Sequence, residues 1–452
     1  MSIYKECDIR GIYPKELNEK NAYEIGRAVG TMMSAKTLAV GGDVRLSTQM
    51  LKDNLIKGLR DSGTNVIDIG MVPTPVFYFS LKHLRVDGGI TVTASHNPAN
   101  YNGFKLMFGD SPVTPAVIKH IESIISTGSY SLGSGSMEST DVNGAYIDFT
   151  TKSHPGGTLK VVLDCCNGAA GNLAPLIFRV LGYNVIPLYC ELDGAFPNRD
   201  PNPAVYKNLK DLKDKVIETG ADFGAAFDGD GDRIVFVDDK GQVLNSESTL
   251  VILIKHYFSQ LSDVAFNSDN SITKSVVYDI KSSSIVKNSV SELGGKPIPE
   301  RSGHAFIKRT FLENRSVLAG EISGHFFFSE LGYDDGIYAA LKMAEILGDG
   351  KKLSDIHSSI PATVITPDIR VYCKYEERDM WLDSVREAGK GYDITLMDGI
   401  RVDFPYGWIL IRKSVTEEGI TIRIEAEDDD HMRMIKKWIT EVLPETKPAV
   451  AK

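Results

Sequence analysis

Cysteine is scarce in this chain of 452 residues, which contains only five. Their spacing is irregular and includes no Cys-x-x-Cys pair, so neither a disulfide framework nor a zinc or thiol-redox centre is indicated. We therefore expect a protein of a reducing compartment, the cytoplasm. The five positions are Cys7, Cys165, Cys166, Cys190 and Cys373.

Positive charge and long apolar runs are also lacking. The formal net charge is −10, whereas nucleic acids and anionic membranes select clustered Lys and Arg. No apolar run approaches the roughly 20 residues that span a bilayer. The first residues, Met-Ser-Ile-Tyr-Lys-Glu-Cys-Asp, carry charges where a signal peptide has an apolar core. We expect no nucleic-acid partner and no membrane partner, and leave monomer or homo-oligomer open.

What is present is ordinary globular composition, with 42% hydrophobic and 24% charged residues. Single hydrophobic cores stop growing at roughly 250–300 residues, so a chain of this length predicts several domains. The pattern predicts three α/β domains, 1–140, 141–243 and 244–364, and a smaller α+β domain, 365–452. The stretch Ser126 to Asp141, rich in Ser and Gly, is expected to be a surface loop or linker between the first two.

Short β-branched and apolar runs alternate with helix-period segments through the first three domains. The expected strands are 37–40, 65–69, 89–93, 159–164, 185–189, 223–227, 234–237, 276–279 and 317–319, and the expected helices are 50–60, 76–84 and 335–347. The last domain is expected to form an antiparallel sheet. Its expected elements are strands at 364–372, 399–402, 408–411 and 420–425, a helix at 377–388 and a closing helix from 429.

Three polar, turn-rich segments each follow an apolar strand, where open α/β sheets place their ligands. They are Thr93-Ala-Ser-His-Asn-Pro98, Asp228-Gly-Asp-Gly-Asp-Arg233 and Gly320-Glu-Ile-Ser-Gly-His325. Each lies in a different expected domain.

The alternation of aspartate and glycine from Asp228 to Asp232 can aim three hard oxygen ligands at one point. An EF-hand calcium loop would have Gly at its sixth position and Glu at its twelfth, where this chain has Arg233 and Asp239. The EF-hand is therefore rejected, and Mg²⁺ suits the cluster if water or phosphate oxygens fill the remaining positions. A solvated acidic turn is the alternative for a bare Asp-Gly-Asp, and the third aspartate and the adjoining arginine weigh against it.

Ser95 is the candidate nucleophile of the first segment, next to His96. A serine hydrolase is not indicated, because the Gly-x-Ser-x-Gly elbow is absent and His96 is too close in sequence to imply a triad. Taken alone, a Ser-His pair is most often an ordinary loop. The interpretation of Ser95 as a nucleophile therefore depends on the other two polar segments.

Together with Asp8-Ile-Arg-Gly11 and Asn167-Gly-Ala-Ala-Gly171, the three segments resemble the α-D-phosphohexomutases in order and along the whole chain. Ile322, between Glu321 and Ser323, is similar to the phosphomannomutase/phosphoglucomutase branch rather than to the phosphoglucosamine mutases. The resemblance implies four domains around a central cleft. It also implies a phosphoryl group on Ser95 and Mg²⁺ held by Ser95, Asp228, Asp230 and Asp232.

The resemblance further implies roles for single residues. Lys105 and either His96 or His325 would transfer protons, and Arg10 and Arg233 would lie beside the phosphate. The implied sugar and sugar-phosphate ligands are Lys281, His304, Glu321, Ser323, Arg412, Ser414 and Thr416. For Lys105, Lys281 and the histidines, an ordinary surface or structural role is the better reading without the motif context.

Two departures from the family pattern are visible. The phosphate loop of the last domain resembles Arg-x-Ser-Asn-Thr-x-Pro in the family, but here it reads Arg412-Lys-Ser-Val-Thr-Glu-Glu418. Val415 replaces an amide side chain, and Glu418 replaces a proline beside an anion site. Cys7 stands where an aromatic residue usually precedes Asp8, and we read it as a small buried residue.

We expect a phosphohexomutase that interconverts hexose 1-phosphate and hexose 6-phosphate of mannose, glucose or both, with glucose 1,6-bisphosphate or mannose 1,6-bisphosphate as activator. A phosphoserine facing three carboxylates requires a divalent cation and an arginine for charge balance. Three alternatives stay open. They are a phosphoglucosamine mutase of the same fold, a non-catalytic sugar-phosphate-binding protein, and a metal-dependent phosphatase.

Overall fold

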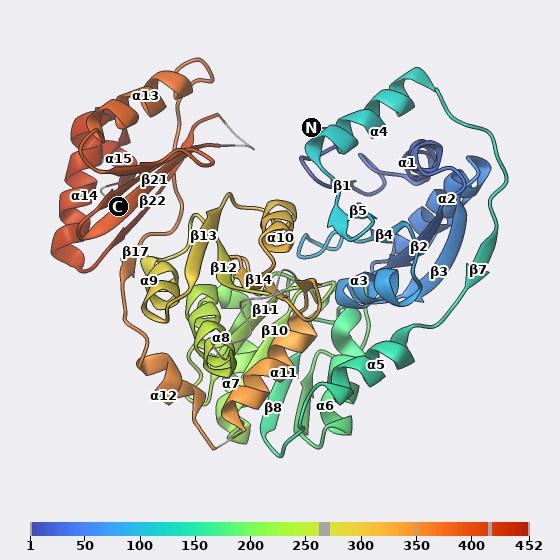
Figure 1. Ribbon diagram of the computed structural model, residues 1–452, viewed down its shortest axis with the longest axis horizontal. Coiled ribbons are helices and arrows are strands. Elements are labelled where there is room, and N and C mark those ends of the chain that lie inside the picture. Colours follow the sequence, from blue (N-terminus) through green and yellow to red (C-terminus); the bar gives the residue numbers. More distant parts are fainter. Residues whose placement is uncertain (1, 262–271, 349, 415–417, 451–452) are drawn as a thin grey trace.

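The computed structural model describes residues 2–261, 272–348, 350–414 and 418–450, and its described residues form four sheets that follow one another along the chain (Figure 1). The first and last sheets stand at opposite ends, and the second and third lie between and below them in that view. Because no sheet takes strands from two of the expected domains, we propose domain boundaries near 140, 243 and 364.

The first sheet is mixed, in the order β1-β5-β4-β2-β3-β7 with β6 on β5. The strands are β1 (Ile9–Ile12), β2 (Thr37–Gly42), β3 (Asn65–Met71), β4 (Gly88–Val92), β5 (Tyr101–Phe108), β6 (Ser111–Pro112) and β7 (Met137–Ser139). The helices are α1 (Glu19–Met32), α2 (Thr48–Asp61), α3 (Thr74–His83) and α4 (Pro115–Thr127). Helices α1 and α2 pack backbone to backbone, since a Cβ on Gly58 would lie 2.2 Å from Tyr23 O.

The stretch from Ser126 to Asp141 is not only a linker, which corrects the sequence-based expectation. Met137–Ser139 forms β7 and pairs in parallel with β3, with Val66 opposite Met137. Its three side chains are exposed, so this edge strand carries none of the buried apolar pattern from which strands are predicted. Backbone pairing alone places it in the sheet.

The second sheet has the order β11-β10-β8-β9, with β10 and β11 antiparallel and the other pairs parallel. Its strands are β8 (Lys160–Asp164), β9 (Asn184–Leu188), β10 (Phe223–Phe227) and β11 (Ile234–Asp238). The helices are α5 (Asn143–Lys152), η1 (Ala169–Gly171), α6 (Ala174–Val180), η2 (Tyr206–Leu209) and α7 (Lys210–Thr219). The aspartate segment thus forms the connection between antiparallel β10 and β11.

The third sheet repeats this plan in the order β13-β12-β14-β15-β16. Its elements are α8 (Ser246–Gln260), β12 (Thr273–Asp279), α9 (Ser284–Glu292), β13 (Lys296–Glu300), α10 (His304–Glu313), β14 (Ser316–Gly320), β15 (Phe326–Phe328), β16 (Tyr333–Asp334), α11 (Gly336–Leu347) and α12 (Leu353–Ser358). The segment Glu321 to His325 connects antiparallel β14 and β15. A backbone bridge between Arg233 and His325 joins it to the aspartate segment.

The fourth sheet is antiparallel, in the order β17-β22-β21-β20-β19 with β18 on β22. Its elements are β17 (Val364–Ile365), β18 (Ile369–Val371), α13 (Arg378–Ala388), β19 (Asp393–Thr395), β20 (Ile400–Phe404), β21 (Gly407–Lys413), β22 (Ile420–Ala426), α14 (Asp429–Val442), η4 (Pro444–Thr446) and α15 (Lys447–Val450). The single strand expected over 364–372 is therefore two short strands. The α/β and α+β classes are confirmed.

The hydrophobic core is continuous through the first three domains. One cluster of buried side chains runs from Ala39 to Ile360, and a second fills the rest of the first domain. The fourth domain has its own core, between its sheet and its helices. Among the described residues, no helix is long and apolar enough to cross a membrane.

Candidate active site

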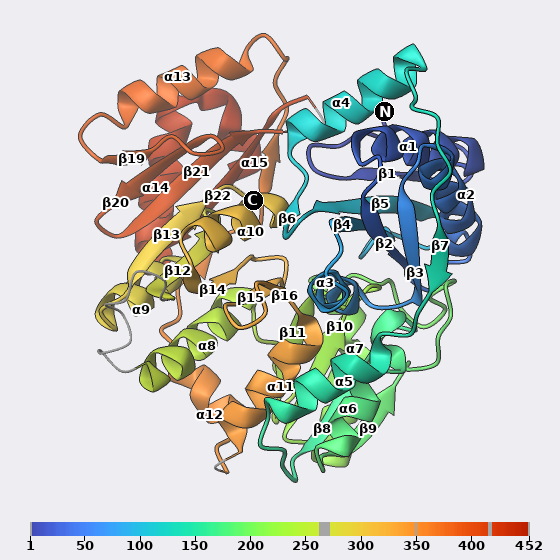
Figure 2. The same cartoon turned by 45° about the vertical axis from the view of Figure 1, so that its right-hand side comes forward.

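A cavity of about 360 Å³ lies where the first three domains meet. The first domain contributes Arg10, Ser95 and Lys105 to its lining, the second contributes Arg233, and the third contributes the histidines and Glu321. Figure 2 shows α10 and the β14–β15 connection facing β4 and β5 across this region. Residues from all three polar segments therefore border one space.

Ser95 faces the aspartate segment. Its hydroxyl donates to Asp228 Oδ2 at 2.7 Å, and His96 Nδ1 lies 3.3 Å from the same Oγ. The backbone of Ser95 has φ +51°, a left-handed conformation that is uncommon for a residue with a side chain. Thr93 supports it by accepting the Ser95 N–H at 2.9 Å.

Asp228, Asp230 and Asp232 are fully buried, and one carboxylate oxygen of each lies within 4.8 Å of the other two. Asp230 Oδ1 and Asp232 Oδ1 have no hydrogen-bond partner within the described residues. Buried carboxylate oxygens are costly unless a donor or a cation satisfies them. The all-oxygen donor set therefore fits a hard divalent cation.

The electrostatics of the cluster agree with a need for positive charge. Burial, and then the repulsion from Asp230 and Asp232, raises the pKa of Asp228 well above its usual range. Lys105 Nζ lies 2.7 Å from Asp230 Oδ2 and 2.5 Å from Asp232 Oδ2. Burial alone would lower the pKa of Lys105, but the aspartates outweigh it and raise that pKa. The two aspartates thus hold Lys105 as an ammonium, which can donate a proton.

His96 and Arg10 also lie close to Ser95, His96 beside its hydroxyl and Arg10 in the lining of the same cavity. Arg10 donates to Asn97 Oδ1 at 2.6 Å and to Asp8 Oδ2 at 2.7 Å. The charge of Arg233, together with burial and Arg10, holds the pKa of His96 far below its usual range. His96 is therefore neutral and can accept a hydrogen bond, but it is a weak base in this setting.

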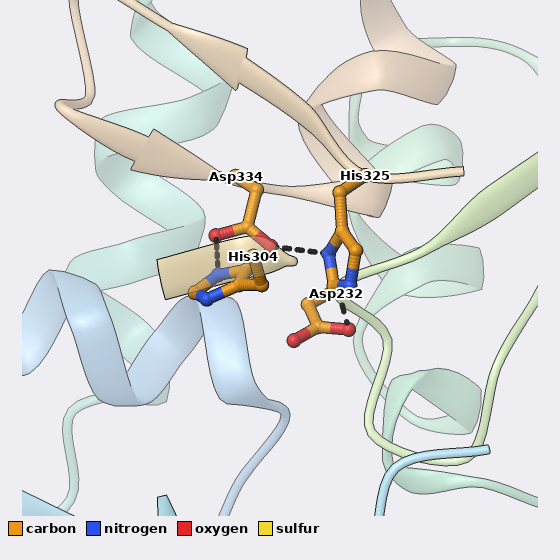
Figure 3. Close-up of side chains that lie close together, drawn as sticks. All are labelled: Asp232, His304, His325 and Asp334. Carbon is orange, nitrogen blue, oxygen red and sulfur yellow. Dashed lines mark hydrogen bonds and ion pairs between the residues drawn. The ribbon is translucent and has the colours of Figure 1, made fainter. Parts of the chain in front are cut away.

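Two histidines share one carboxylate in the third domain. Asp334 Oδ2 lies 2.6 Å from His325 Nδ1, and Asp334 Oδ1 lies 2.8 Å from His304 Nε2 (Figure 3). Arg233 Nε donates to His325 Nε2 at 2.9 Å. Since arginine has only donors, His325 must carry its proton on Nδ1 and a lone pair on Nε2. Figure 3 also places Asp232 beside His325, with Oδ1 3.7 Å from Nδ1.

Asp334 was not predicted from the sequence. It is fully buried, and although burial opposes its ionisation, His304 and His325 hold its pKa well below the usual range. Thr74 was also missed, and it crosses from the first domain to donate to Asp230 Oδ2 at 2.6 Å. Neither residue has a clear local signal, since Asp334 ends a strand of only two residues, Tyr333–Asp334, and nothing local marks Thr74.

Glu321 and Ser323 stand in the turn between β14 and β15. Glu321 lines the cavity. Ser323 Oγ is buried and has no hydrogen-bond partner among the described residues. A buried hydroxyl without a partner costs free energy that a ligand hydroxyl could recover. This fits the expected contact with a sugar, which stays a prediction.

Three further expected ligands, Lys281, Arg412 and Ser414, lie outside the cavity lining. Lys281 Nζ pairs with Asp368 Oδ2 at 2.6 Å. Arg412 Nη2 pairs with Asp398 Oδ2 at 2.5 Å, and its Nη1 lies 3.5 Å from Ser302 Oγ, which borders the cavity. Ser414 ends the described part of this loop, and Thr416 lies outside the described residues. The fourth domain therefore reaches the cavity edge through Arg412.

Family models match most of the chain. They are the α/β/α domains I, II and III of phosphoglucomutase/phosphomannomutase, over residues 1–131, 143–241 and 245–364. The chain belongs to this family, which confirms the resemblance read from the five motifs.

Characterised relatives extend the match to the fourth domain. The chain is 38% identical to a phosphomannomutase/phosphoglucomutase of Pseudomonas aeruginosa, covering 96% of this chain and 94% of that one. It is 34% identical to a phosphoglucomutase of Neisseria gonorrhoeae, covering 98% and 96%. A crystal structure of a Burkholderia thailandensis member of the family superposes with a TM-score of 0.90 at 34% identity, covering 99% of this chain and 98% of that one.

Proposed function

We propose that this protein is a phosphohexomutase that moves a phosphoryl group between the 1- and 6-hydroxyls of a hexose through phospho-Ser95. The observation that carries the proposal is the approach of Ser95 Oγ to Asp228 across two domains, at 2.7 Å. Relatives named for mannose and for glucose both match the chain at 34–38% identity. We therefore propose mannose or glucose 1-phosphate, or both, as substrate.

Mg²⁺ is the cation we propose for the three aspartates, with a phosphoryl oxygen on Ser95 as a further ligand. When bound, it supplies charge neutralisation to a transferring phosphoryl group. The carboxylate donor set and the two unpartnered oxygens support this assignment. Lys105 and Arg233 add positive charge on either side of Ser95.

In the forward step, the bond between Ser95 Oγ and phosphorus breaks as the free sugar hydroxyl oxygen bonds to phosphorus. The hydroxyl proton must leave, and we propose His325 Nε2 as its acceptor, because Asp334 holds the opposite nitrogen protonated. This requires Arg233, which donates to Nε2 in this structure, to turn to the phosphoryl group.

The Ser95 oxygen takes up a proton as its bond to phosphorus breaks, and we propose the Lys105 ammonium as the donor. Ser95 is then a hydroxyl that donates to Asp228. The bisphosphate then reverses in the cavity, and its other phosphoryl group returns to Ser95 by the same steps run backwards.

The groups that would hold the distal phosphate come from the third and fourth domains. We propose Arg412, Ser414, Thr416, Lys281 and His304 for this role, and Glu321 and Ser323 for the sugar hydroxyls. A non-catalytic binding protein is the weaker reading, since it would not require the Ser95, aspartate and His325–Asp334 constellation. The free thiols of all five cysteines support a proposed cytoplasmic location.

The test is a mutase assay on both hexose 1-phosphates with a catalytic amount of glucose 1,6-bisphosphate, combined with intact-mass measurement. Wild-type protein should turn over and show a fraction about 80 Da heavier, as one phosphoryl group requires. Ser95→Ala should lose the heavier fraction and nearly all turnover. A wild-type rate in Ser95→Ala rejects the mechanism, and steady release of inorganic phosphate would instead identify a phosphatase.

A further inference from the structure

The loop that carries Ser95 is held from behind by one buried side chain, Arg45, which is 2% exposed. Its guanidinium donates to four backbone carbonyls of this loop. Nη2 reaches Ser95 O at 2.7 Å and Asn97 O at 2.6 Å. Nη1 reaches Pro98 O at 2.6 Å and Tyr101 O at 3.0 Å.

Asp43 fixes Arg45 in turn. Arg45 Nε donates to Asp43 Oδ2 at 3.0 Å, and Asp43 also accepts from Thr48 at 2.8 Å and Thr93 at 2.7 Å. Thr93 is the residue that accepts the Ser95 N–H. The guanidinium therefore has one orientation, set by a fully bonded carboxylate.

The backbone around Ser95 needs such a support. A residue with a side chain at φ +51° is strained and persists only where its surroundings impose that conformation. Four carbonyl oxygens that converge on one point also repel one another unless a cation lies between them. Arginine offers five donors in a planar fork, whereas lysine offers a point charge on a flexible stem.

The same arginine touches the second domain. The ring of Phe196 lies 5.0 Å from Arg45 Cζ, a distance typical of a cation–π contact. A Cβ added to Gly229 would lie 2.6 Å from Ser95 O and 3.3 Å from the Phe196 ring. Phe196 therefore contacts both the support of the serine loop and the start of the aspartate segment.

We propose that Arg45 is a positioning residue for phosphoryl transfer and that, with Phe196, it sets the placement of Ser95 Oγ relative to Asp228. The inference rests on the proposed function, since the distance that it sets is the one across which that function operates. Arg45 itself contacts no substrate group, being buried behind the loop.

The test compares Arg45→Lys with Arg401→Lys, a matched control in the fourth domain. Arg401 is 5% exposed, pairs with Asp403, donates to Ile280 O at 2.8 Å and lies 4.1 Å from the Trp408 ring. It thus has the same kinds of contact far from Ser95. Both substitutions keep the positive charge but remove the planar guanidinium and its five N–H donors.

Arg45→Lys should lower kcat by about 10- to 100-fold, the cost of a misplaced reacting atom, with KM changed by less than about threefold. Amide hydrogen exchange should accelerate in peptides covering residues 94–102. Arg401→Lys should leave that exchange unchanged. An unchanged kcat in folded Arg45→Lys overturns the proposal, and so does equal loss of kcat in both variants.

Phe196→Leu keeps the inference testable if Arg45→Lys does not fold. It should lower kcat by a smaller factor and again accelerate exchange only in the serine loop, and a wild-type kcat with wild-type exchange overturns the role of the pair. Failure of the proposed function looks different. The wild type itself would then lack mutase activity, while hydrogen exchange would still report whether Arg45 holds the loop.

Discussion

The joint between the first and second domains differs from the joint between the third and fourth. At the first, buried polar contacts cross the boundary within one continuous core, including Ser95 to Asp228 at 2.7 Å and Thr74 to Asp230 at 2.6 Å. At the second, a small apolar cluster of Ile280, Trp408 and Leu410 lies between two separate cores.

Polar contacts at the second joint are more open to solvent. Lys281 pairs with Asp368, whose side chain is 35% exposed, and Arg423 lies 3.4 Å from Glu247. One buried carboxylate, Glu425, accepts from Ser284 N at 2.8 Å and from Trp408 Nε1. The second joint is thus a small apolar pivot flanked by ion pairs, and the Lys281–Asp368 pair is partly open to water.

This difference matches two demands of the proposed reaction. Phosphoryl transfer needs reacting atoms at fixed distances, which buried and fully bonded contacts provide. A substrate that binds in two orientations needs phosphate contacts whose positions can adjust. The chemistry is accordingly expected at the first joint and the adjustable phosphate contacts beyond the second.

The largest expected effect is the loss of activity on chelation. Excess EDTA should abolish turnover and Mg²⁺ should restore it, because three buried carboxylates around Ser95 are otherwise left without sufficient positive charge. Asp228→Asn should weaken Mg²⁺ binding in a direct titration. The matched control is Asp238→Asn, a buried aspartate at the end of neighbouring β11, which should bind Mg²⁺ as the wild type does. Full activity in excess EDTA would contradict the metal assignment.

The next effect concerns the carboxylate between the histidines. Asp334→Asn should lower kcat by about 100-fold, within the range of a lost acid–base contribution, because the amide can donate to one histidine and so no longer fixes the tautomer of both. The pH profile of kcat should shift as well. Asp335→Asn is the control, since Asp335 caps α11 through Tyr338 N and Asn caps nearly as well. Equal loss of kcat in both variants would show that Asp334 acts through folding alone.

A smaller effect is expected beyond the pivot. Arg412→Ala should raise KM by about 10- to 150-fold, which corresponds to the loss of one charge-assisted contact worth about 1.5–3 kcal/mol. The variant should also release more bisphosphate and depend more on added bisphosphate. Lys413→Ala, which removes the neighbouring partner of Asp379, should change KM less than twofold. If Arg412→Ala leaves KM unchanged, this loop is not the phosphate site.

The smallest expected effect is on the free energy of unfolding, and it concerns the packing between α10 and the first domain. Lys308, on α10, is 1% exposed, with Nζ 3.7 Å from the Tyr78 ring centre, and burial lowers its pKa from 10.5 to about 8. Between about pH 8 and 10.5 the unfolded chain keeps a proton that the folded chain has released, so the free energy of unfolding rises with pH in that window.

Urea unfolding of wild type and Lys308→Met at pH 7.5 and 9.5 checks this. The rise, about 3 kcal/mol at most over the whole window, should be present in the wild type and absent from the variant. Identical pH dependence in both proteins would show that Lys308 keeps its ordinary pKa. Water would then reach its ammonium between α10 and the first domain.

Several parts of the fold could be predicted because their signals are local. Apolar runs predicted β2, β3, β4, β8, β10 and β14. The polar turns that follow three of these strands predicted the segments 93–98, 228–233 and 320–325. Strand β7 could not be predicted, because its exposed residues carry no apolar pattern. The split of 364–372 into β17 and β18 did have a local signal, because Pro367 lies in the break and proline cannot donate to a strand ladder.

The sequence by itself determined the family and the fold class, and it predicted the proposed reacting groups Ser95, Asp228, Asp230 and Asp232, because each belongs to a short motif whose residue types suit one chemistry. Only the tertiary structure decided which groups meet. Arg45 lies 50 residues before Ser95 and Asp334 lies 30 after His304, and neither role has a local pattern. Side chains of buried networks are specified by partners that only folding brings together, and the protonation of His325 follows from such partners.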